Sequence, residues 1–418
     1  MQKFIVRGGR RLCGELTLQG SKNSALPIMA AAALCDGDCV LKNCPELTDI
    51  YAASRILNCI GCKCRYSANT AVITASELTT TAIPASLMQE MRSSIIFLGA
   101  VLGKAGECTV CLPGGCELGP RPIDMHLAGM RKMGADISDY GGNIVCRAHG
   151  RLHGAKISLP FPSVGATENL ILSAVNADGE TVINNAAREP EIADLCGFLR
   201  ACGADIAGGG ESSIVIRGVE RLHGCEYTVM PDRIAGATYL AMAAAAGGEI
   251  ILTNACVQGM EPFLSVLEQT GCSIYSSEDR IYLRCGSRLK ALSDRVRTMP
   301  HPGFPTDAQA VLMAALTTAE GTSVFEENIF DCRYRHTDAL VKMGADIQVM
   351  GKIAVVKGVN RLHGAKIEAT DLRGGAAMAA AALGADGITE ISGISHIDRG
   401  YERLEEAVSI LGGDIKRV

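Results

Sequence analysis

The chain contains 418 residues, of which 48% are hydrophobic and 20% are charged, and its formal net charge is -5 at pH 7. These values are typical of a globular protein with about two domains. Because no dense basic run is present, we expect no nucleic-acid partner. The N-terminal segment MQKFIVRGG has no long apolar core. Neither a signal peptide nor a membrane-spanning segment is therefore predicted, and we expect a cytoplasmic protein without membrane association.

The 18 cysteines raise the question of disulfides or metal binding. A chain of this length needs no disulfide framework, and many of its cysteines lie in apolar runs, so reduced and buried thiols are expected. The spacing of Cys59, Cys62 and Cys64 suggests a metal site, but no His/Cys pair nearby completes the four ligands. In the repeat described next, Cys62 and Cys64 correspond to Ala135 and Ile137, so we favour buried apolar positions over zinc binding.

Three sequence markers recur along the chain and indicate an internal repeat. A glycine that precedes a short strand-like run recurs every 66 to 73 residues, at Gly37, Gly106, Gly179, Gly248, Gly321 and Gly387. A second glycine, which begins Gly-x-x-Ile or a variant, follows at Gly61, Gly134, Gly203, Gly271, Gly344 and Gly412. The third marker, Arg-Leu-x-Gly, begins at Arg11, Arg151, Arg221 and Arg361. Only part of this motif is kept at Arg288 and near Leu78. We interpret the markers as six diverged copies of one unit.

Each copy is predicted to fold as β-α-β-α-β-β, which places the chain in the α/β (α+β) class. The first helix of a copy is rich in small residues, as in residues 30–33 and 241–246, which favours a buried central helix packed closely against its neighbours. Three copies per domain, with a boundary near Met230, is the most economical division and predicts two similar lobes facing a cleft. His153, His223 and His363 share one repeat position, which favours a structural turn role over a ligand cluster.

Polar and charged residues that depart from the repeat gather where helices are predicted to start. After the first strands stand residues 21–23, 91–93, 163–165, 232–233, 305–307 and 371–373, and after the second strands 116–121, 188–190, 331–333 and 396–399. Helix N-termini expose unpaired N–H groups and a positive dipole end, so several of them with added Lys and Arg favour a ligand carrying multiple anionic groups. Salt-bridged helix capping is the alternative interpretation.

The segment 112–122, Leu-Pro-Gly-Gly-Cys-Glu-Leu-Gly-Pro-Arg-Pro, combines two glycines, one thiol and one guanidinium. Glycine allows backbone conformations that other residues resist, and Pro120 and Pro122 hold Arg121 in an extended frame. A nearby fixed cation favours the nucleophilic thiolate, whereas a cysteine in apolar surroundings is usually inert. We therefore favour a functional Cys116 over a structural one.

These residues together resemble the UDP-N-acetylglucosamine enolpyruvyl transferase family along the whole chain. The motifs that carry the resemblance are Gly20-Ser-Lys22-Asn23, Met91-Arg92-Ser93-Ser94, Leu112-Pro-Gly-Gly-Cys116, Gly119-Pro-Arg121-Pro122-Ile-Asp124, Ser163-Val-Gly165, Asn185-Ala-Ala-Arg-Glu-Pro-Glu191, Pro231-Asp-Arg233, His301-Pro-Gly-Phe-Pro-Thr-Asp307, Thr370-Asp-Leu-Arg373 and His396-Ile-Asp-Arg399-Gly-Tyr-Glu-Arg403. The resemblance implies two inside-out, barrel-like α/β domains, each of three repeats around buried helices. It implies domains of residues 22–230 and of residues 1–21 plus 231–418, with the active site in the cleft between them.

The family's reaction is transfer of the enolpyruvyl group of phosphoenolpyruvate to the 3-hydroxyl of UDP-N-acetylglucosamine, with release of phosphate. The resemblance therefore implies the first committed step of peptidoglycan synthesis, with no metal or organic cofactor. It assigns proton donation to Cys116 and proton abstraction to Asp307. The phosphoenolpyruvate ligands it implies are Lys22, Asn23, Arg121 and Arg399, with Lys22 and Arg399 counted as catalytic. The remaining implied substrate contacts are Arg92, Pro122, Ile123, Asp124, Met125, Ser163, Val164, Gly165, Arg233, Ile329, Asp371 and Arg373.

Three positions depart from what several relatives show, namely Thr48 in place of lysine, Asp331 in place of glutamate, and Gly374. None removes a central group, so substrate affinity is more in question than reaction type. Two other functions remain open at this point. One is a catalytically idle paralogue that binds UDP-sugar and regulates a partner, which intact Lys22 and Cys116 argue against. The other is the shikimate-pathway enolpyruvyl transferase, which is not expected to carry the Pro-Gly-Gly-Cys loop.

Overall fold

The computed structural model describes residues 2–114 and 123–418, which divide into two compact units. Unit 1 contains residues 2–19 and 231–418, and unit 2 contains residues 20–114 and 123–230. The first described residues therefore belong to the same unit as the C-terminal half of the chain. Among the described residues, no helix is both long enough and apolar enough to span a membrane.

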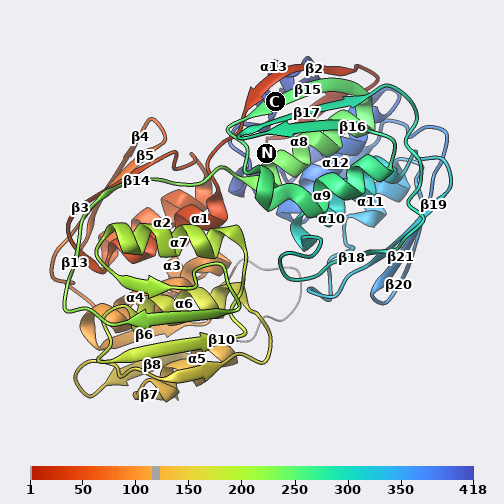
Figure 1. Ribbon diagram of the computed structural model, residues 1–418. Helices are drawn as coiled ribbons and strands as arrows, with labels where there is room; N and C mark the ends of the chain where they lie inside the picture. Colours follow the sequence, from red (N-terminus) through yellow and green to blue (C-terminus); the bar gives the residue numbers. More distant parts are fainter. Residues whose placement is uncertain (1, 115–122) are drawn as a thin grey trace. The chain divides into compact units, whose positions relative to one another are not determined.

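Unit 2 is built from three β-sheets that lie outside a group of helices (Figure 1). The first sheet contains β3 (Cys35–Lys42), β4 (Lys63–Ser67), β5 (Thr70–Ala75), β13 (Leu222–His223) and β14 (Glu226–Thr228). The second contains β6 (Glu107–Cys111), β7 (Ala135–Tyr140) and β8 (Asn143–Ala148). The third contains β9 (Lys156–Ser158), β10 (Glu180–Asn184), β11 (Asp205–Ala207) and β12 (Ser213–Arg217).

The helices of unit 2 divide into an almost completely buried group and a more peripheral group. The buried helices are α1 (Lys22–Ala32), α4 (Ile96–Ala105), which continues the 3-10 helix η1 (Arg92–Ile95), and α6 (Val164–Ala174). The others are α2 (Thr48–Cys59), α3 (Ala85–Met88), α5 (Asp124–Lys132) and α7 (Pro190–Ala201).

Unit 1 repeats this plan with three four-stranded sheets. The first contains β2 (Leu12–Thr17), β15 (Gly248–Thr253), β16 (Ser273–Ser277) and β17 (Arg280–Cys285). The second contains β18 (Val296–Arg297), β19 (Thr322–Glu326), β20 (Asp346–Met350) and β21 (Ile353–Lys357). The third contains β1 (Phe4–Arg7), β22 (Lys366–Glu368), β23 (Ile388–Ser392) and β24 (Asp414–Arg417). Its helices are α8 (Arg233–Ala246), α9 (Val257–Gln269), α10 (Thr306–Leu316), α11 (Thr337–Lys342), α12 (Leu372–Gly384), the 3-10 helix η2 (Ile394–Arg399) and α13 (Leu404–Ile410).

One connection pattern recurs in these sheets and confirms the predicted β-α-β-α-β-β copy. In the third sheet of unit 2, β9 pairs in parallel with β10 across α6, and β10 and β11 both pair antiparallel with β12. The sheet of β18, β19, β21 and β20 has the same order and directions. A parallel pair requires a crossover helix, whereas the antiparallel pair closes with a short turn.

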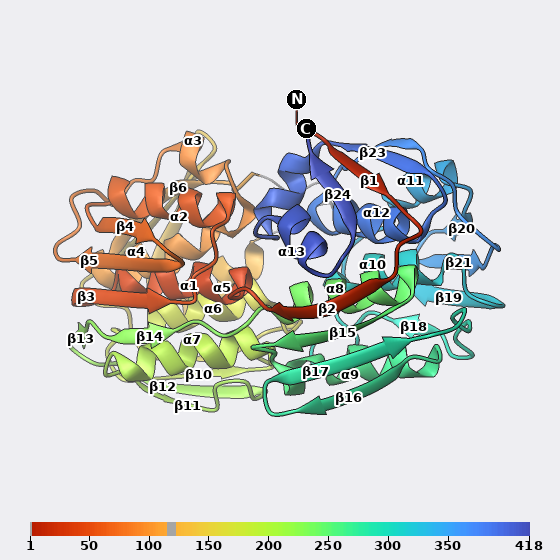
Figure 2. The same ribbon diagram turned by 90° about the horizontal axis from the view of Figure 1, so that it is seen from above.

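In both units, a sheet is completed by strands that are distant in sequence from their partners. The N-terminal strand β2 pairs in parallel with β15, and β1 pairs antiparallel with both β23 and β24, as Figure 2 shows for the red segment. In unit 2, β13 and β14 pair in parallel with β3, about 190 residues earlier in the chain. Each unit is therefore closed by segments that are distant in sequence.

Small residues let the central helices approach closely, as the sequence predicted. Helices α8, α10 and α12 pack against one another, and α4 packs against α6. A Cβ atom added to Gly384 would lie 2.6 Å from the carbonyl oxygen of Ala245, and one added to Gly99 would lie 2.4 Å from that of Asn169. Because both values are below any tolerable contact, larger residues would force these helices apart.

The second glycine marker ends helices or turns at the same place in all six copies. All six glycines have positive φ, from 82° to 106°, a region that residues with a Cβ resist. The backbone N–H groups of His153, His223 and His363 donate to the carbonyl oxygens of Met133, Cys202 and Met343 at 2.9 Å, each directly before such a glycine. The shared histidines therefore lie at one recurring turn, the position that the repeat predicted for them.

Candidate active site

The first set of expected helix starts is confirmed in all six copies. The N-cap residues are Ser21 of α1, Met91 of η1, Ser163 of α6, Asp232 of α8, Pro305 of α10 and Asp371 of α12. Three of these N-termini lie in unit 2 and three lie in unit 1. The side chains of Ser21, Ser163, Asp232 and Asp371 accept hydrogen bonds from one or two N–H groups of the first turn. The positive end of the helix dipole at such an N-terminus favours anionic ligands.

The second set of expected helix starts was largely wrong. Only residues 188–190 behave as predicted, since Glu189 is the N-cap of α7. Residues 331–333 lie in turns, and α11 begins after His336. Residues 396–399 lie within η2, which Arg399 ends. A basic residue at the end of a helix agrees with the dipole, so Arg399 needs no dipole-based explanation. Residues 116–121 lie outside the described residues.

In unit 2, the first residue of α1 carries the predicted cation. The Nζ atom of Lys22 lies 3.2 Å from Oδ2 of Asp49 in the first turn of α2, and both side chains are buried. The Ser24 hydroxyl contacts the Asp194 carboxylate, which also accepts hydrogen bonds from the Tyr227 hydroxyl at 2.7 Å and the Met230 amide at 3.1 Å. The start of α1 is thus fixed from two sides.

The starts of α5 and α6 meet around a buried histidine. Ile123 is the N-cap of α5, and Asp124 and Met125 form its first turn. The Asn169 amide nitrogen lies 2.7 Å from Nδ1 of His126, and a Cβ atom added to Gly165 would lie 3.3 Å from the His126 ring.

The same Asn169 side chain also holds the start of α4. Its amide nitrogen donates to the Ile95 carbonyl oxygen at 2.9 Å, and its Oδ1 accepts from the Gly99 N–H at 2.7 Å. Burial, and after it the nearby charge of Arg92, lowers the pKa of His126 to about 4. The ring is therefore neutral near pH 7, with Nδ1 as the acceptor for Asn169.

Acidification should weaken unit 2 through His126. Since the folded-state pKa lies below the ordinary value, His126 contributes stability that is present above about pH 6.5 and is lost as the pH falls towards 4. The full loss is about 3 kcal/mol for the 2.5-unit difference. We expect urea midpoints, followed by far-UV circular dichroism, to fall between pH 7 and pH 5. The fall should be smaller in His126→Gln, whose amide can still accept a hydrogen bond. The exposed control His153→Gln should behave like the unmodified protein, and an unchanged fall in His126→Gln would contradict the assignment.

In unit 1, a carboxylate stands between two arginines at the start of α10. Oδ1 of Asp307 accepts from Nη2 of Arg333 at 2.8 Å, and Oδ2 accepts from Nη2 of Arg373 at 3.3 Å. The arginine side chains are 2% and 3% exposed, whereas the Asp307 side chain is 29% exposed. Asp307 is thus held in place from the protein side while part of it remains accessible.

The second of these arginines is fixed by its own set of contacts. Nη1 of Arg373 donates to the Tyr401 hydroxyl at 3.0 Å, and that hydroxyl lies 2.8 Å from the Thr238 hydroxyl. Burial opposes the charge, but Tyr401, Asp307 and Asp232 raise the pKa of Arg373 and keep it a cation. Arg233, the first residue of α8, is also buried.

The side chain of Asp371 caps the start of α12. Its Oδ1 accepts from the N–H groups of Arg373 at 3.1 Å and Gly374 at 2.9 Å. A Cβ atom added to Gly374 would lie 2.4 Å from Oδ2 of Asp371. The unusual glycine at this position therefore fits tightly beside the capping carboxylate.

Glu327 links the start of α10 with the segment that contains Ile329. Its carboxylate accepts from the Thr306 hydroxyl at 3.0 and 3.1 Å and from the N–H groups of Ile329 at 2.8 Å and Phe330 at 3.0 Å. Arg333 also donates to the Thr306 carbonyl oxygen, at 2.9 Å from Nη2.

The last predicted residues are placed as follows. Arg399 is half-buried at the end of η2, next to Asp398, whose carboxylate is bound by Arg417 at 2.6 and 3.0 Å. Cys116, Arg121 and Pro122 lie outside the described residues. Ile329 lies in the segment between β19 and α11, and the remaining predicted residues stand at or near helix starts.

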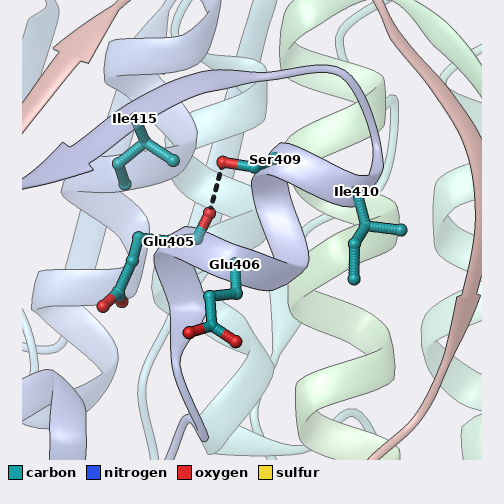
Figure 3. Close-up of a pocket in the computed structure, with 5 residues that line it drawn as sticks. All are labelled: Glu405, Glu406, Ser409, Ile410 and Ile415. Carbon is teal, nitrogen blue, oxygen red and sulfur yellow. Dashed lines mark hydrogen bonds between the residues drawn. The ribbon is translucent and has the colours of Figure 1, made fainter.

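One pocket of unit 1 contains none of the predicted residues. Figure 3 shows it beside α13, where Glu405, Glu406, Ser409, Ile410 and Ile415 line a volume of about 490 Å³. The Ser409 hydroxyl donates to the Glu405 carbonyl oxygen at 2.7 Å. Its lining holds no cation, so it does not match the anionic ligand expected from the sequence.

Sequence reasoning missed several residues that hold the site in place. Asp49 binds Lys22, Arg333 binds Asp307, and Tyr401 binds Arg373. Arg333 follows Asp331 in the noted motif Asp-Cys-Arg, and Tyr401 follows Arg399 in the noted motif Arg-Gly-Tyr. Their closeness in sequence to Asp331 and Arg399 was the available signal. For Asp49 the signal was weaker, since it only follows Thr48, a position that was noted as a departure from several relatives.

The comparisons with known proteins agree on one family. The family model described as EPSP synthase (3-phosphoshikimate 1-carboxyvinyltransferase) matches residues 6–408. A UDP-N-acetylglucosamine 1-carboxyvinyltransferase 2 from Caldanaerobacter subterraneus subsp. tengcongensis is 48% identical over 418 residues. The alignment covers 100% of this chain and 100% of that relative. The Zymomonas mobilis UDP-N-acetylglucosamine 1-carboxyvinyltransferase is 47% identical over 426 residues, with the same complete coverage of both chains.

The solved structures show the same fold. The enolpyruvyl transferase NikO from Streptomyces tendae superposes with a TM-score of 0.89 at 24% identity, covering 100% of this chain and 99% of its own. EPSP synthase from Acinetobacter baumannii gives a TM-score of 0.79 at 21% identity, with both chains covered completely. The predicted fold class is therefore confirmed. With relatives at 47% and 48% identity along its full length, the chain belongs to the UDP-N-acetylglucosamine 1-carboxyvinyltransferase family of enolpyruvyl transferases.

Proposed function

We propose that this protein transfers the enolpyruvyl group of phosphoenolpyruvate to the 3-hydroxyl of UDP-N-acetylglucosamine and releases phosphate. The observation that carries the proposal is the full-length identity to transferases named for this activity. The Pro-Gly-Gly-Cys sequence of residues 113–116 adds support, because it distinguishes this reading from the shikimate-pathway enzyme. The step is the first committed one of peptidoglycan synthesis, and both substrates are small molecules.

Asp307 is proposed to take the proton from the attacking 3-hydroxyl. Two arginine contacts and a position at the start of α10 orient its carboxylate, and its partial exposure leaves room for a substrate hydroxyl. The oxygen then bonds to C2 of phosphoenolpyruvate, while Cys116 donates a proton to the methylene carbon. The resulting tetrahedral ketal loses that methyl proton and expels phosphate, which restores the double bond.

The anionic groups of phosphoenolpyruvate are proposed to bind Lys22, Arg121 and Arg399, with Asn23 beside them. Lys22 lies at the first position of α1, where the N–H groups and the dipole add to its charge. Because Lys22 belongs to unit 2 and Arg399 to unit 1, the proposal takes the ligands of phosphoenolpyruvate from both units.

The nucleotide sugar is proposed to bind along several helix starts. The residues involved are Arg92, Pro122, Ile123, Asp124, Met125, Ser163, Val164, Gly165, Arg233, Ile329, Asp371 and Arg373. In this set Arg92 and Ser163 stand at the starts of η1 and α6, which suit the diphosphate. Arg373 also donates to Asp307 at 3.3 Å, so it additionally helps to position that carboxylate.

The decisive test is release of inorganic phosphate from phosphoenolpyruvate by the purified protein. We expect release only when phosphoenolpyruvate and UDP-N-acetylglucosamine are both present, together with a product heavier than the nucleotide sugar by one enolpyruvyl group. Replacing the sugar by shikimate 3-phosphate should give no release. Phosphate release from phosphoenolpyruvate with shikimate 3-phosphate but not with the nucleotide sugar would contradict the proposal. Binding of the nucleotide sugar without any phosphate release would contradict it as well.

Lysine should not replace arginine at position 399. Arginine binds a carboxylate or phosphate through two parallel N–H bonds, a geometry that lysine cannot reproduce. We expect Arg399→Lys to lower kcat/KM for phosphoenolpyruvate by about 10- to 100-fold, the equivalent of one charge-assisted hydrogen bond, while UDP-N-acetylglucosamine binding is retained. Steady-state kinetics and calorimetry would measure the two effects. Arg284→Lys, an exposed exchange on β17, is the matched control. Equal kinetics in both variants would rule out anion binding by Arg399.

A further inference from the structure

Four cysteine thiols gather in unit 2, beyond the C-terminal end of α1. The Sγ atoms of Cys35, Cys39 and Cys202 all lie within 4.8 Å of one another, and all three residues are buried. The Sγ atom of the half-buried Cys225 lies 3.4 Å from that of Cys202. Lys22 is at the other end of α1, about 15 Å away along the helix. This thiol cluster is therefore separate from the proposed reaction.

Three segments far apart in sequence bring the thiols together. Cys35 and Cys39 lie on β3, on either side of Gly37, whose φ of 97° marks the point where β3 changes partner from β13 to β14. Cys202 caps the C-terminus of α7, and its carbonyl oxygen accepts the His223 N–H. Cys225 lies between β13 and β14, and its carbonyl oxygen accepts a hydrogen bond from the Val40 N–H of β3 at 2.8 Å.

The other copies of the repeat show that the fold does not require thiols here. The equivalent positions around β10 and β23 can be identified from the same backbone bond, from His153 to Met133 and from His363 to Met343. Around β10 they hold Met133, Ala155, Ala177 and Thr181, and around β23 they hold Met343, Ala365, Ala385 and Thr389. Methionine, alanine and threonine therefore fill this space elsewhere, and the four cysteines are a departure from the repeat.

We propose that the thiol cluster binds one Zn²⁺ ion as a closed, tetrahedral, all-thiolate structural site. Four sulfur ligands at about 2.3 Å from zinc are separated by about 3.8 Å. The Sγ atoms of Cys35, Cys39 and Cys202 already lie within 4.8 Å of one another, and the Sγ atom of Cys225 lies 3.4 Å from that of Cys202, so metal binding requires the Cys225 thiol to move towards the other two. Thiolates select soft cations over Mg²⁺ or Ca²⁺, and four protein ligands leave no open position for catalysis. Each thiol releases its proton to solvent on binding. The site joins β3 from the start of unit 2 to α7, β13 and β14 from its end, so the metal would stabilise the closure of this unit.

The metal content of the purified protein tests the proposal. Protein from zinc-supplemented cultures, kept with a non-thiol reductant and passed through a desalting column, should hold about one zinc per chain by mass spectrometry of the metal. The test variant carries Cys35→Ala, Cys39→Thr, Cys202→Met and Cys225→Ala, the residues found at the equivalent positions around β10. It should hold less than about a tenth of an equivalent. Cys196→Ala, a buried thiol of α7 outside the cluster, is the matched control and should keep the zinc.

Cobalt provides a readout that does not depend on the variant folding. Co²⁺ added to the metal-free protein should give the intense visible and sulfur-to-metal bands of a tetrahedral thiolate site, and Zn²⁺ should displace it. Chelation should lower the melting temperature of the unmodified protein but not that of the fourfold variant. Absence of zinc from the unmodified protein, the weak spectrum of octahedral cobalt, or zinc retained by the fourfold variant would each overturn the proposal. A disulfide between Cys202 and Cys225 in the reduced preparation would overturn it as well.

Discussion

Replacing Asp307 by asparagine is expected to lower kcat by about two to four orders of magnitude, the usual effect of removing a general base. Asparagine has nearly the same shape, but it cannot accept a proton near neutral pH. It also presents an NH₂ group to one of two buried guanidinium groups, which lie 2.8 and 3.3 Å from the present carboxylate oxygens. Phosphate release under saturation with both substrates gives kcat, and calorimetry gives the affinity for the nucleotide sugar.

Two further variants separate the proton transfer from the charge balance. Asp307→Glu keeps a carboxylate but moves it by one methylene, so part of the activity should return. Asp338→Asn removes an exposed carboxylate from the first turn of α11 and should leave kcat unchanged. A kcat for Asp307→Asn within about threefold of the unmodified protein would remove Asp307 from the role of base, because even a weak general base contributes more.

The parts of the fold that could be predicted from sequence are those set by local chemistry. Helix starts at Ser21, Ser163 and Asp371 depend on a side chain that accepts an N–H two or three residues later, so the residue type alone indicates them. The left-handed glycines that follow α5 and α7 are equally local. Repetition of the glycine signals six times then revealed the copies, and runs of small residues indicated the buried helices.

The parts that could not be predicted depend on contacts between distant segments. Lys22 and Asp49 are 27 residues apart, and Arg333 and Asp307 are 26 apart, so no spacing rule pairs them. The helix start expected at residues 331–333 is absent, and directly before it Glu327 binds the N–H groups of Ile329 and Phe330, which stabilises a turn.

The thiol cluster was missed for the same reason. Its members are separated in sequence by up to 190 residues, whereas the closely spaced Cys59, Cys62 and Cys64 drew attention. Among the described residues, the thiols of Cys35, Cys39 and Cys202 lie close enough together to hold a metal ion. Cys59, Cys62 and Cys64 are not part of such a group. Cys62 is buried beside β4, as its match to Ala135 predicted.

Cys116 is expected to tolerate aspartate better than serine. As proton donor, the residue needs an acidic group whose pKa can lie near the working pH. A thiol meets this requirement, and so does a carboxyl group if its surroundings raise its pKa, but an alcohol is far too weak an acid. We expect Cys116→Ser to lose about 100-fold or more in kcat, whereas Cys116→Asp keeps appreciable turnover with a shifted pH profile.

The same two variants separate proton donation from nucleophilic attack. A phosphonate epoxide that imitates phosphoenolpyruvate needs a soft sulfur nucleophile, which neither aspartate nor serine supplies. The unmodified protein should therefore be alkylated at Cys116, faster with UDP-N-acetylglucosamine present, while Cys116→Asp remains active in its presence. Peptide mass mapping identifies the labelled thiol, and phosphate release across pH gives the turnover of each variant. If serine supports turnover as well as cysteine does, the donor role is wrong. If the label falls on another of the 18 cysteines, the thiol at position 116 is not the reactive one.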